Sequence, residues 1–327
     1  MRIAMRTLRA RTLIDVRASA GGKRMSSALC KSALPHRAAL TARAAWIVVA
    51  LACLDVQTPA LGDDTISIDP SDLAHTAKLT FSDEFDTLSL WDGSGGTWDT
   101  TYWWSQGKNG VTLASNHEQQ WYIDSRYAPT ASVRPWSVSN GILSLIAAPA
   151  DPKFRPLING YGYTSGMLTT YRAFMQQGGY FEMRAKLPAG QGIWPAFWML
   201  PADGSWPPEL DAMEMLGHDP ATIFMTVHSQ ATGTHTQAQG SAKVPETSAA
   251  FHTYGVLWEA SKITWSFDGQ PVYTTTPPSD LNKPLYILVN LAIGGDWPGS
   301  PDATTPFPAV YQIDYVRAYA PLCTRTR

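Results

Sequence analysis

Short strand-like runs separated by turns recur along this chain, and no stretch after residue 63 shows the apolar spacing of a long amphipathic helix. Many short strands without intervening helices indicate a β-sandwich or a barrel. A (β/α)₈ barrel would require eight helices, and a propeller would require an internal repeat that the sequence lacks. The runs that favour strands are 141–148, 179–187, 222–229, 253–260, 262–275, 285–293 and 311–320.

Turn dipeptides mark where these strands reverse. Within residues 262–275, Ile263, Trp265 and Phe267 alternate with polar residues before Asp268-Gly269, which predicts a tight hairpin turn. Asn-Gly pairs at 109–110, 140–141 and 159–160 punctuate the first half of the chain. No Ser/Thr/Pro-rich linker follows residue 63, so we expect residues 63–327 to form a single domain.

The first 62 residues have the layout of an export signal rather than of a folded element. Residues 1–43 hold ten Lys or Arg and one acid, Asp15, and an apolar run follows at Ala44–Val56. A small-x-small cleavage site stands at 60–62, and Met25 is an alternative start. The apolar run is short for a membrane span, and an uncleaved N-terminal anchor is the alternative. We expect a secreted or periplasmic protein without stable membrane association after cleavage.

Beyond residue 62 the chain is acidic, with 15 Lys and Arg against 25 Asp and Glu. This excess argues against nucleic acid or an anionic membrane as a partner. Cys30 and Cys53 lie in the leader, which leaves Cys323 without an internal disulfide partner. About 265 residues are enough to bury a core that holds the domain together. No metal-type Cys/His spacing occurs, and we expect a monomer that needs no organic cofactor.

Three acidic residues interrupt an otherwise apolar segment, PPELDAMEMLG at 207–217. Glu209, Asp211 and Glu214 stand among Leu and Met residues that favour a buried strand, where an unused carboxylate is costly. In a regular strand Glu209 and Asp211 share one face and Glu214 points to the other. One extra residue, a β-bulge at Ala212-Met213, would return Glu214 to the face of the other two acids. We therefore predict that all three carboxylates point into one cleft.

Convergent carboxylates of this kind suit retaining glycoside hydrolysis. One carboxylate attacks the anomeric carbon, a second protonates the leaving oxygen and then activates water, and the two groups lie about 5–5.5 Å apart. The middle acid holds the nucleophile and raises the pKa of its neighbour through its charge. The alternatives are a Ca²⁺ site, which prefers loop ligands and a glycine turn, and charge pairing without chemistry. The flanking Leu and Met residues favour a strand and hence catalysis.

The chain contains 13 tryptophans, several of them close to the acidic segment. Flat indole rings with an N–H donor are suitable platforms for sugar rings, although core packing is the alternative for each of them. Trp258 and Trp265 stand in alternating strands, and we predict that they pack in the core. The tryptophans of Gly- or Pro-flanked loops, which we expect to line the cleft, are Trp103, Trp194, Trp206 and Trp297.

The segment ELDAMEMLG resembles the E-[IL]-D-x-x-E signature of glycoside hydrolase family 16, the laminarinase and lichenase group. Further motifs stand in that family's order over residues 79–320, nearly all of the mature chain. With Met213 in this context, the sequence is similar to bacterial exopolysaccharide glycanases of the succinoglycan-depolymerising kind. The supporting motifs are FSDEFD (81–86), HEQQWY (117–122), NGILSLIA (140–147), YTSGMLTT (163–170), GYFEMRAKLPAGQGIWPAFWMLP (179–201), HTYGVLWE (252–259), ITWSFDG (263–269), NLAIGGDWPG (290–299) and IDYVRAY (313–319).

The resemblance implies an all-β jelly-roll sandwich of the concanavalin A-like type, with a catalytic cleft on its concave sheet. It implies Glu209 as nucleophile, Asp211 as its electrostatic helper and Glu214 as general acid/base. For His228, a strand histidine satisfied by a neighbour is an open alternative to a role in the cleft. The positions that resemble glycan contacts are Trp194, Trp198, His228, Asn290 and Trp297. The positions that resemble a structural Ca²⁺ site on the convex side are Glu84, Gly141 through its carbonyl, and Asp314.

These expectations describe a secreted retaining endo-β-glycanase. Its polysaccharide substrate would be β-1,3-glucan, mixed β-1,3-1,4-glucan or a bacterial exopolysaccharide, hydrolysed by double displacement. A transglycosylase would use the same residues with a sugar in place of water as acceptor. A non-catalytic glucan-binding protein usually lacks an acid of the triad, and all three acids are present here. A lectin-like structural protein would bind glycan in the presence of Ca²⁺ and form no product.

Overall fold

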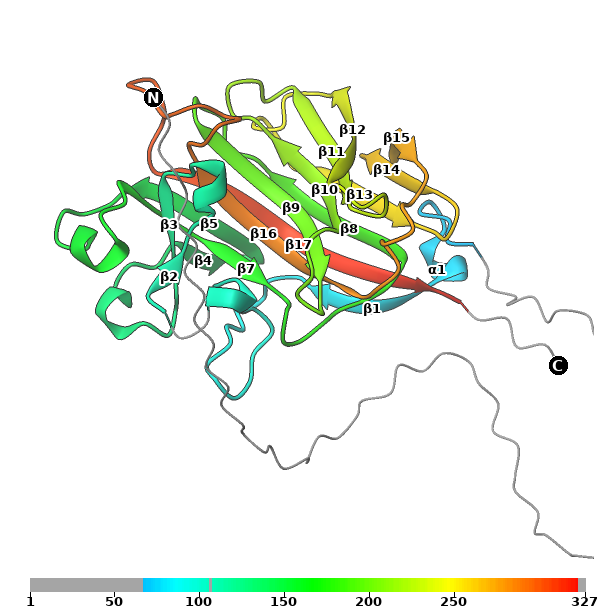
Figure 1. The fold of residues 1–327 in the computed structure, drawn as a ribbon, viewed down its shortest axis with the longest axis horizontal. Helices are drawn as coiled ribbons and strands as arrows, with labels where there is room; N and C mark the ends of the chain where they lie inside the picture. The colour runs from blue at the N-terminus through cyan, green and yellow to red at the C-terminus, as the bar shows by residue number, and fades with distance from the viewer. Residues whose placement is uncertain (1–66, 106–107, 323–327) are drawn as a thin grey trace, which may run out of the picture. The chain divides into compact units, whose positions relative to one another are not determined.

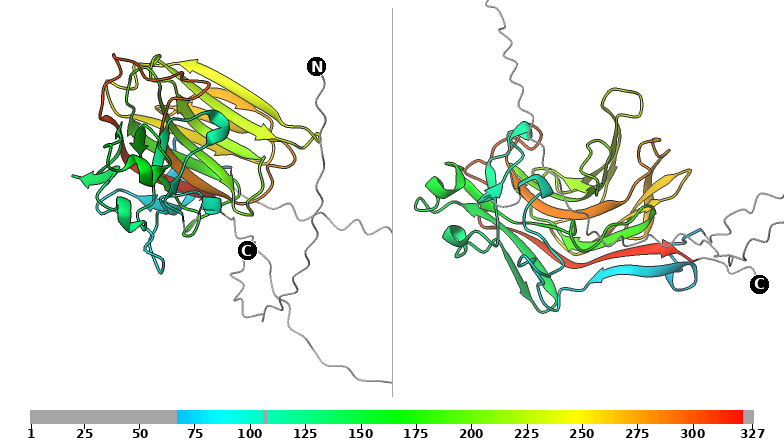
Figure 2. Two further views of the ribbon diagram at one scale, coloured as in Figure 1. Left: turned by 60° about the vertical axis from the view of Figure 1, so that its left-hand side comes forward. Right: turned by 60° about the horizontal axis from the view of Figure 1, so that its bottom comes forward.

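The computed structural model describes residues 67–105 and 108–322, which belong to one compact unit, Leu61–Arg327. The predicted leader at 1–62, the alternative start Met25 and the three cysteines lie outside the described residues. Two β-sheets lie face to face and curve together (Figure 1, Figure 2). No helix within the described residues is long and apolar enough to cross a membrane.

The larger sheet has eleven strands and forms the outer layer of the sandwich. Its strands, in the order in which they pair, are β15 (Gln270–Thr275), β14 (Ile263–Phe267), β13 (His252–Trp258), β8 (Gly179–Lys186), β17 (Ala309–Pro321), β5 (Ile142–Pro149), β6 (Tyr163–Ser165), β3 (Gln120–Ile123) and β2 (Gly110–Val111), with β1 (Ala77–Asp83) paired to β17 and β4 (Trp136–Ser139) paired to β5.

The smaller sheet has six strands, and the candidate site lies on it. Its order is β12 (Thr236–Lys243), β11 (Thr222–Ser229), β10 (Glu209–Met215), β9 (Ile193–Pro201), β16 (Leu285–Ile293) and β7 (Met167–Thr169). The helical turns are short and lie in the connections between strands: α1 (Leu73–Thr76), η1 (Trp103–Ser105), η2 (Ala114–Asn116), η3 (Ala128–Thr130) and η4 (Arg155–Ile158).

Strand β16 shows how the pleat builds two apolar layers from one sequence. Every residue of β16 is buried. Its alternate side chains Leu285, Ile287 and Val289 enter the main core between the sheets. Tyr286 and Leu288 point to the other face, where they join a second, smaller cluster. Because both faces are covered, the strand is apolar throughout instead of alternating.

The strand runs predicted from the sequence are confirmed. Residues 262–275 form the antiparallel hairpin of β14 and β15, and its turn residues Asp268 and Gly269 have φ values of 47° and 74°, as a tight primed turn requires. Asn140 and Gly141 likewise have positive φ between β4 and β5. Trp258 and Trp265 are buried in the core. The predicted two-sheet sandwich is therefore observed, and no helical layer covers either sheet among the described residues.

Candidate active site

Strand β10 contains the predicted bulge. Asp211 pairs with Thr226 of β11 and Glu214 pairs with Phe224, so three steps along β10 match two steps along its neighbour. The register against β9 shifts at the same place, between Asp211 and Met213. An extra residue of this kind reverses the alternation of faces beyond it. Glu214 therefore returns to the face of Glu209 and Asp211, as predicted.

The two faces of β10 have opposite chemistry. Leu210, Ala212, Met213 and Met215 all enter the main core, so both residues of the bulge point inward. The three acids all line one open cleft on the other face, with a volume of about 780 Å³. None of the described residues that line this cleft is Lys or Arg. The carboxylates therefore meet without a Lys or Arg among the described residues of the cleft, and His228 is the basic side chain beside them.

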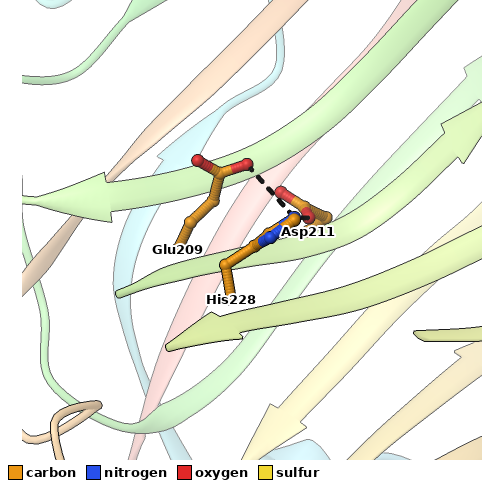
Figure 3. A group of neighbouring side chains, drawn as sticks. All are labelled: Glu209, Asp211 and His228. Carbon is orange, nitrogen blue, oxygen red and sulfur yellow. Dashed lines mark ion pairs between the residues drawn. The ribbon is translucent and has the colours of Figure 1, made fainter. Parts of the chain in front are cut away.

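Glu209 lies at the start of β10, where Trp206 and His228 contact it. Trp206 Nε1 donates a hydrogen bond to Glu209 Oε2 at 2.6 Å. His228 Nε2 lies 3.8 Å from Glu209 Oε1 (Figure 3). Burial and the negative charge of Asp211 raise the pKa of Glu209 well above its usual value, while His228 and the Trp206 bond act to lower it. The two lowering contacts favour the ionised form that a nucleophile needs.

Asp211 is the most enclosed of the three acids, at 2% exposure. Its Oδ2 has no aligned hydrogen-bond partner among the described residues, although His228 Nε2 lies 3.3 Å away (Figure 3). Burial raises the pKa of Asp211 to about 7, and its hydrogen bond with Glu209 opposes that rise. Asp211 and Glu209 thus share a site in which ionising both carboxyls is costly.

Glu214 lies at the far side of the bulge and has one opposing contact. Trp194 Nε1 donates a hydrogen bond to Glu214 Oε1 at 3.1 Å. Burial, then the charges of Asp211 and Glu209, raise the pKa of Glu214 well above its usual value. No histidine accompanies Glu214 as His228 accompanies Glu209, so the proton is retained more readily on Glu214. The site therefore combines a carboxyl suited to donate a proton with a carboxylate suited to attack.

The residues that resemble glycan contacts all line the cleft, in two groups. Trp194 and Trp297 are half-buried and pack edge to face, with centroids 5.6 Å apart. Trp198 and Asn290 lie deeper, at 8% and 5% exposure, and Trp198 Nε1 donates to Asn290 Oδ1 at 2.6 Å. Asn290 Nδ2 donates in turn to the Tyr122 hydroxyl at 2.8 Å. The first pair offers ring surface, and the second forms the cleft floor.

His228 lines the cleft and also has polar partners on its neighbours. The two alternatives given for it, a cleft residue and a histidine bonded to a neighbour, are therefore both observed. It lies on β11 opposite Glu209 of β10. One ring nitrogen faces Asp211, and the other, Nδ1, lies 2.9 Å from His235 Nε2. Trp206 packs against both imidazoles. His228 is therefore part of a connected polar group rather than a separate side chain.

Sequence reasoning did not identify several residues of the cleft wall. Glu118 is 5% exposed and accepts hydrogen bonds from Asn116 Nδ2 at 3.1 Å and Gln120 Nε2 at 2.5 Å. Burial raises the pKa of Glu118 to about 7 against these two bonds. The available signal was an acid two residues from an amide on each side, Asn116 before the HEQQWY motif and Gln120 within it. The other unpredicted wall residues include Tyr102, Trp104, His235, Gln237 and Gln239.

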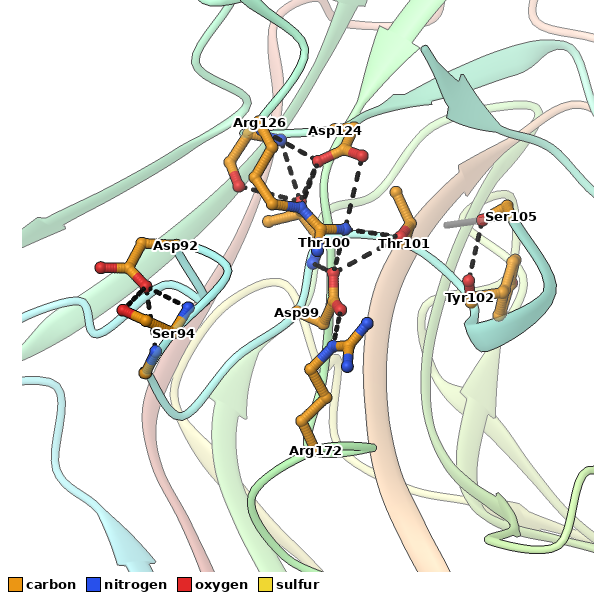
Figure 4. A network of polar contacts seen from close by, with 12 residues as sticks. Asp92, Ser94, Asp99, Thr100, Thr101, Tyr102, Ser105, Asp124, Arg126 and Arg172 are labelled. Carbon is orange, nitrogen blue, oxygen red and sulfur yellow. Dashed lines mark hydrogen bonds and ion pairs between the residues drawn. The ribbon is translucent and has the colours of Figure 1, made fainter. Parts of the chain in front are cut away.

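A network of charged residues anchors the segment that carries Tyr102, Trp103 and Trp104 (Figure 4). Asp99 accepts from Arg126 Nη2 at 3.0 Å and from Arg172 Nε at 2.9 Å. Asp124 accepts from Arg126 Nε at 3.1 Å. Asp99 also forms a backbone bridge with Thr169, which ends β7. The network thereby fixes the chain just before it enters the cleft wall.

The positions that resemble a calcium site do not offer free carboxylates. Arg317 donates to both carboxylate oxygens of Glu84, at 2.8 and 2.7 Å. The carboxylate of Asp314 is paired with Arg184. A Cβ at Gly141 would lie 3.6 Å from the Glu84 carbonyl oxygen, so these two backbones are close. Arg317 contacts both oxygens of Glu84 and Arg184 contacts one oxygen of Asp314, so a Ca²⁺ ion shared by the two carboxylates would have to compete with both arginines.

Comparison with known proteins places this geometry in context. Residues 123–317 match the family model described as Glycosyl hydrolases family 16. The endo-1,3-1,4-beta-glycanase ExsH of Rhizobium meliloti (strain 1021) is 53% identical over 255 residues, which cover 78% of this chain and 53% of that protein. EglC, a second endo-1,3-1,4-beta-glycanase of that strain, is 52% identical over 241 residues, covering 74% and 51%. The chain spans about half the length of these curated relatives.

Solved structures of similar proteins confirm the jelly-roll sandwich. The laminarinase from Rhodothermus marinus superposes with a TM-score of 0.62 at 31% identity, over 75% of this chain and 98% of that one. The laminarinase catalytic domain from Thermotoga maritima MSB8 gives a TM-score of 0.61 at 31% identity, over 75% and 99%. Both comparisons cover nearly the whole of the solved chain, so the sandwich described above is the complete fold of those domains.

Proposed function

The chain belongs to glycosyl hydrolases family 16, and from this premise we propose that it is an exported retaining endo-β-glycanase that cleaves glucan by double displacement. The observation that carries the proposal is the bulge in β10, which turns Glu209, Asp211 and Glu214 into one cleft that contains no described Lys or Arg. Without the bulge, Glu214 would enter the core. A buried strand has no structural need for three carboxylates on one face.

The first chemical step breaks the glycosidic bond. Glu209 attacks the anomeric carbon through one carboxylate oxygen, and Glu214 gives its proton to the departing glycosidic oxygen. The leaving sugar departs as an alcohol, and the remaining sugar is bound as an ester of Glu209. The N–H of Trp206 stabilises Glu209 while it is ionised. Asp211 shares a hydrogen bond with Glu209, and the proton of that bond lies on Asp211 when Glu209 attacks.

The second step returns the enzyme to its starting state. Glu214, now a carboxylate, takes a proton from water, and the hydroxide oxygen attacks the anomeric carbon. The ester bond to Glu209 breaks, and the sugar leaves with the configuration it had in the polymer. Glu214 is protonated again, and Glu209 is ionised again. No organic cofactor takes part in either step.

The charge of the cleft favours an uncharged stretch of polysaccharide as its occupant. The described wall contains four acids, the three on β10 and Glu118, without Lys or Arg. An anionic sugar substituent would be repelled there and would find no Lys or Arg partner among the described wall residues. The indoles of Trp194 and Trp297 suit neutral sugar rings. We therefore propose a β-1,3- or mixed β-1,3-1,4-glucan, or the neutral backbone of a bacterial exopolysaccharide, as substrate.

The experiment measures reducing ends released from laminarin, lichenan, agarose, carrageenan and a succinoglycan-type polymer, with Glu209→Gln as the control. Proton NMR of the first product establishes whether its anomeric configuration is retained. Release from one glucan with retention, lost in the control, is the expected result. Products longer than the substrate would indicate a transglycosylase. Binding without any product would indicate a glucan-binding protein, and inversion would contradict the nucleophile assignment.

Export and the free monomer are parts of the same proposal. The basic leader with its short apolar run supports secretion to the periplasm or the medium, where polysaccharide is accessible. N-terminal sequencing of the protein recovered from culture medium and periplasm tests the cleavage site near residue 62. Light scattering of the recovered protein tests the monomer.

A further inference from the structure

The cleft contains a second histidine, His235, that belongs to none of the motifs discussed above. It lies in the hairpin between β11 and β12, one residue before β12 begins. His235 Nε2 is 2.9 Å from His228 Nδ1, and the two rings stack with centroids 5.2 Å apart and an interplanar angle of 19°. Trp206 packs against the His235 ring at 5.1 Å. These contacts separate His235 from the catalytic acids by one residue, His228.

The hairpin that carries His235 is held in a defined position. Asp280 accepts hydrogen bonds from the Ser229 hydroxyl at 2.7 Å and from the Gln230 backbone N–H at 2.8 Å. Gly233 N–H donates to the Gln230 carbonyl, which closes the turn. Strands β11 and β12 pair in register up to Ser229 and Thr236. The separation between the two imidazoles is therefore fixed by both ends of the loop.

Hydrogen-bond chemistry allows only one proton between the two imidazoles. A neutral imidazole has one N–H donor and one acceptor nitrogen, so one ring must donate and the other must accept. Buried Asp211 Oδ2 lacks an aligned partner and faces His228 Nε2 at 3.3 Å. An N–H at Nε2 would point at this carboxylate. Neutral His228 must then accept at Nδ1, and His235 must donate from its Nε2.

We propose that His235 is a positioning residue that, together with Asp211, fixes the tautomer of His228, with the His228 proton on Nε2 facing Asp211. This inference rests on the proposed function for its effect on catalysis and not for the tautomer itself. The charged groups facing the pair are Glu209 and Asp211 from β10, with Asp280 at the base of the loop. With its proton on Nδ1 instead, His228 would present a lone pair to Asp211 and repel it.

The test uses three variants of similar reach. His235→Gln keeps a neutral N–H donor, His235→Leu removes the donor, and His235→Glu offers only an acceptor. The ¹⁵N shifts of the His228 ring in the full protein report its tautomer without any substrate. We expect a protonated Nε2 and a bare Nδ1 in the wild type and in His235→Gln. His235→Glu should place protons on both nitrogens of His228, and His235→Leu should give a mixture of tautomers.

Activity provides the second measurement. In His235→Leu we expect kcat/KM to fall about tenfold, with KM little changed, because Asp211 loses a fixed donor. His235→Gln should recover most of that loss, whereas a residue that merely filled space would be replaced better by Leu. A wild-type spectrum with the proton on Nδ1, or identical His228 spectra in wild type and His235→Leu, would overturn the inference. If the wild type shows the expected tautomer but cleaves no glucan, the proposed function fails and the positioning role stands.

Discussion

The protein contains two groups of enclosed carboxylates that differ in their partners. Asp99 and Asp124, each 2% exposed, receive hydrogen bonds from Arg126, and Asp99 also receives one from Arg172. No Lys or Arg among the described residues forms an ion pair with Glu209, Asp211 or Glu214. The first group holds a segment of chain in place. The second group keeps its carboxylates unneutralised, and their pKa values rise.

The difference shows how burial separates structural from chemical acids. A buried carboxylate paired with arginine has its charge neutralised by that cation and is held in place by it. A buried carboxylate without such a partner has a raised pKa, so it can both donate and accept a proton during the reaction. The second arrangement lowers the free energy of unfolding, and the large core between the two sheets compensates for this loss. Replacing a catalytic acid should therefore lower activity and not stability, and replacing an arginine-paired acid should lower stability.

The largest expected effect is on activity, at Glu209. We expect Glu209→Gln to lower kcat by roughly 10³-fold or more, because no other group replaces the attacking oxygen. Its midpoint of thermal unfolding should be equal to or above that of the wild type, because a group that is costly to ionise is removed. Calorimetry and the reducing-end assay measure the two quantities. A large loss of stability in this variant would place Glu209 with the structural acids.

The opposite result is expected for the arginine-paired group. Asp99→Asn removes the carboxylate that Arg126 and Arg172 both contact, and we expect a loss of about 2–3 kcal/mol in the free energy of unfolding. The arginines are 24% and 27% exposed, so water limits the penalty. Denaturant unfolding measures the loss. Unchanged stability, with kcat greatly reduced in the folded variant, would remove the distinction between the two groups.

Two indole donors sharpen the comparison within the catalytic acids. Trp206→Phe removes the bond to Glu209, so the pKa of Glu209 rises and the acid limb of kcat/KM moves to higher pH, with a loss of about tenfold at low pH. Trp194→Phe removes the bond to Glu214, so the pKa of Glu214 rises and the alkaline limb moves to higher pH. Full pH profiles distinguish the two. Movement of the same limb in both variants would refute the assignment of nucleophile and acid.

Glu118 tests whether a buried acid with amide partners but no Lys or Arg partner lowers the stability of the protein. Its pKa of about 7 in the folded protein lies above its usual value, so the folded state binds more protons than the unfolded state across that interval. Stability should therefore fall as pH rises from about 4.5 to 7 and remain low above that window. We expect Glu118→Gln to gain about 1–2 kcal/mol at pH 8 and almost nothing at about pH 4, below the usual pKa. Equal gains at both pH values would point to packing instead.

The smallest effect is expected on the convex side. Because Arg317 and Arg184 already neutralise Glu84 and Asp314, adding Ca²⁺ to EDTA-treated protein should raise the midpoint of thermal unfolding by no more than about 2 °C. Differential scanning calorimetry measures this shift, with Asp314→Asn as the control. A rise of many degrees that is absent in the control would show that calcium displaces the arginines and would restore the site implied by the family resemblance.

The fold could be predicted where alternation or turn chemistry was strong. The hairpin at 262–275 and the apolar strand at 285–293 combine both signals, and both were located. Strand β12 was not identified, because TQAQGSAK is polar and reads as a loop. It lies at the edge of the smaller sheet with most of its residues exposed, so tertiary pairing with β11 replaces the hydrophobic signal.

The catalytic acids could be predicted because they lie within six residues of one strand. Because side chains alternate along a strand, the spacing of the three acids was enough to predict the bulge. His235, Glu118 and the arginine network could not be predicted in this way. Glu118 and His235 bond to residues at most seven positions away, but their place in the cleft depends on how loops pack, and Arg172 lies 73 residues from Asp99. Such contacts depend on how loops pack over the sheet, and no local period in the sequence encodes that packing.

The bulge in β10 also affects how the length of this strand can change during evolution. An inserted residue normally exchanges the inner and outer faces of everything that follows, and few active-site strands would survive it. Here the two bulge residues, Ala212 and Met213, both point inward. Removing one of them would restore plain alternation and leave all three acids facing outward. During evolution, one residue could therefore be gained or lost in this strand while all three acids still faced the cleft.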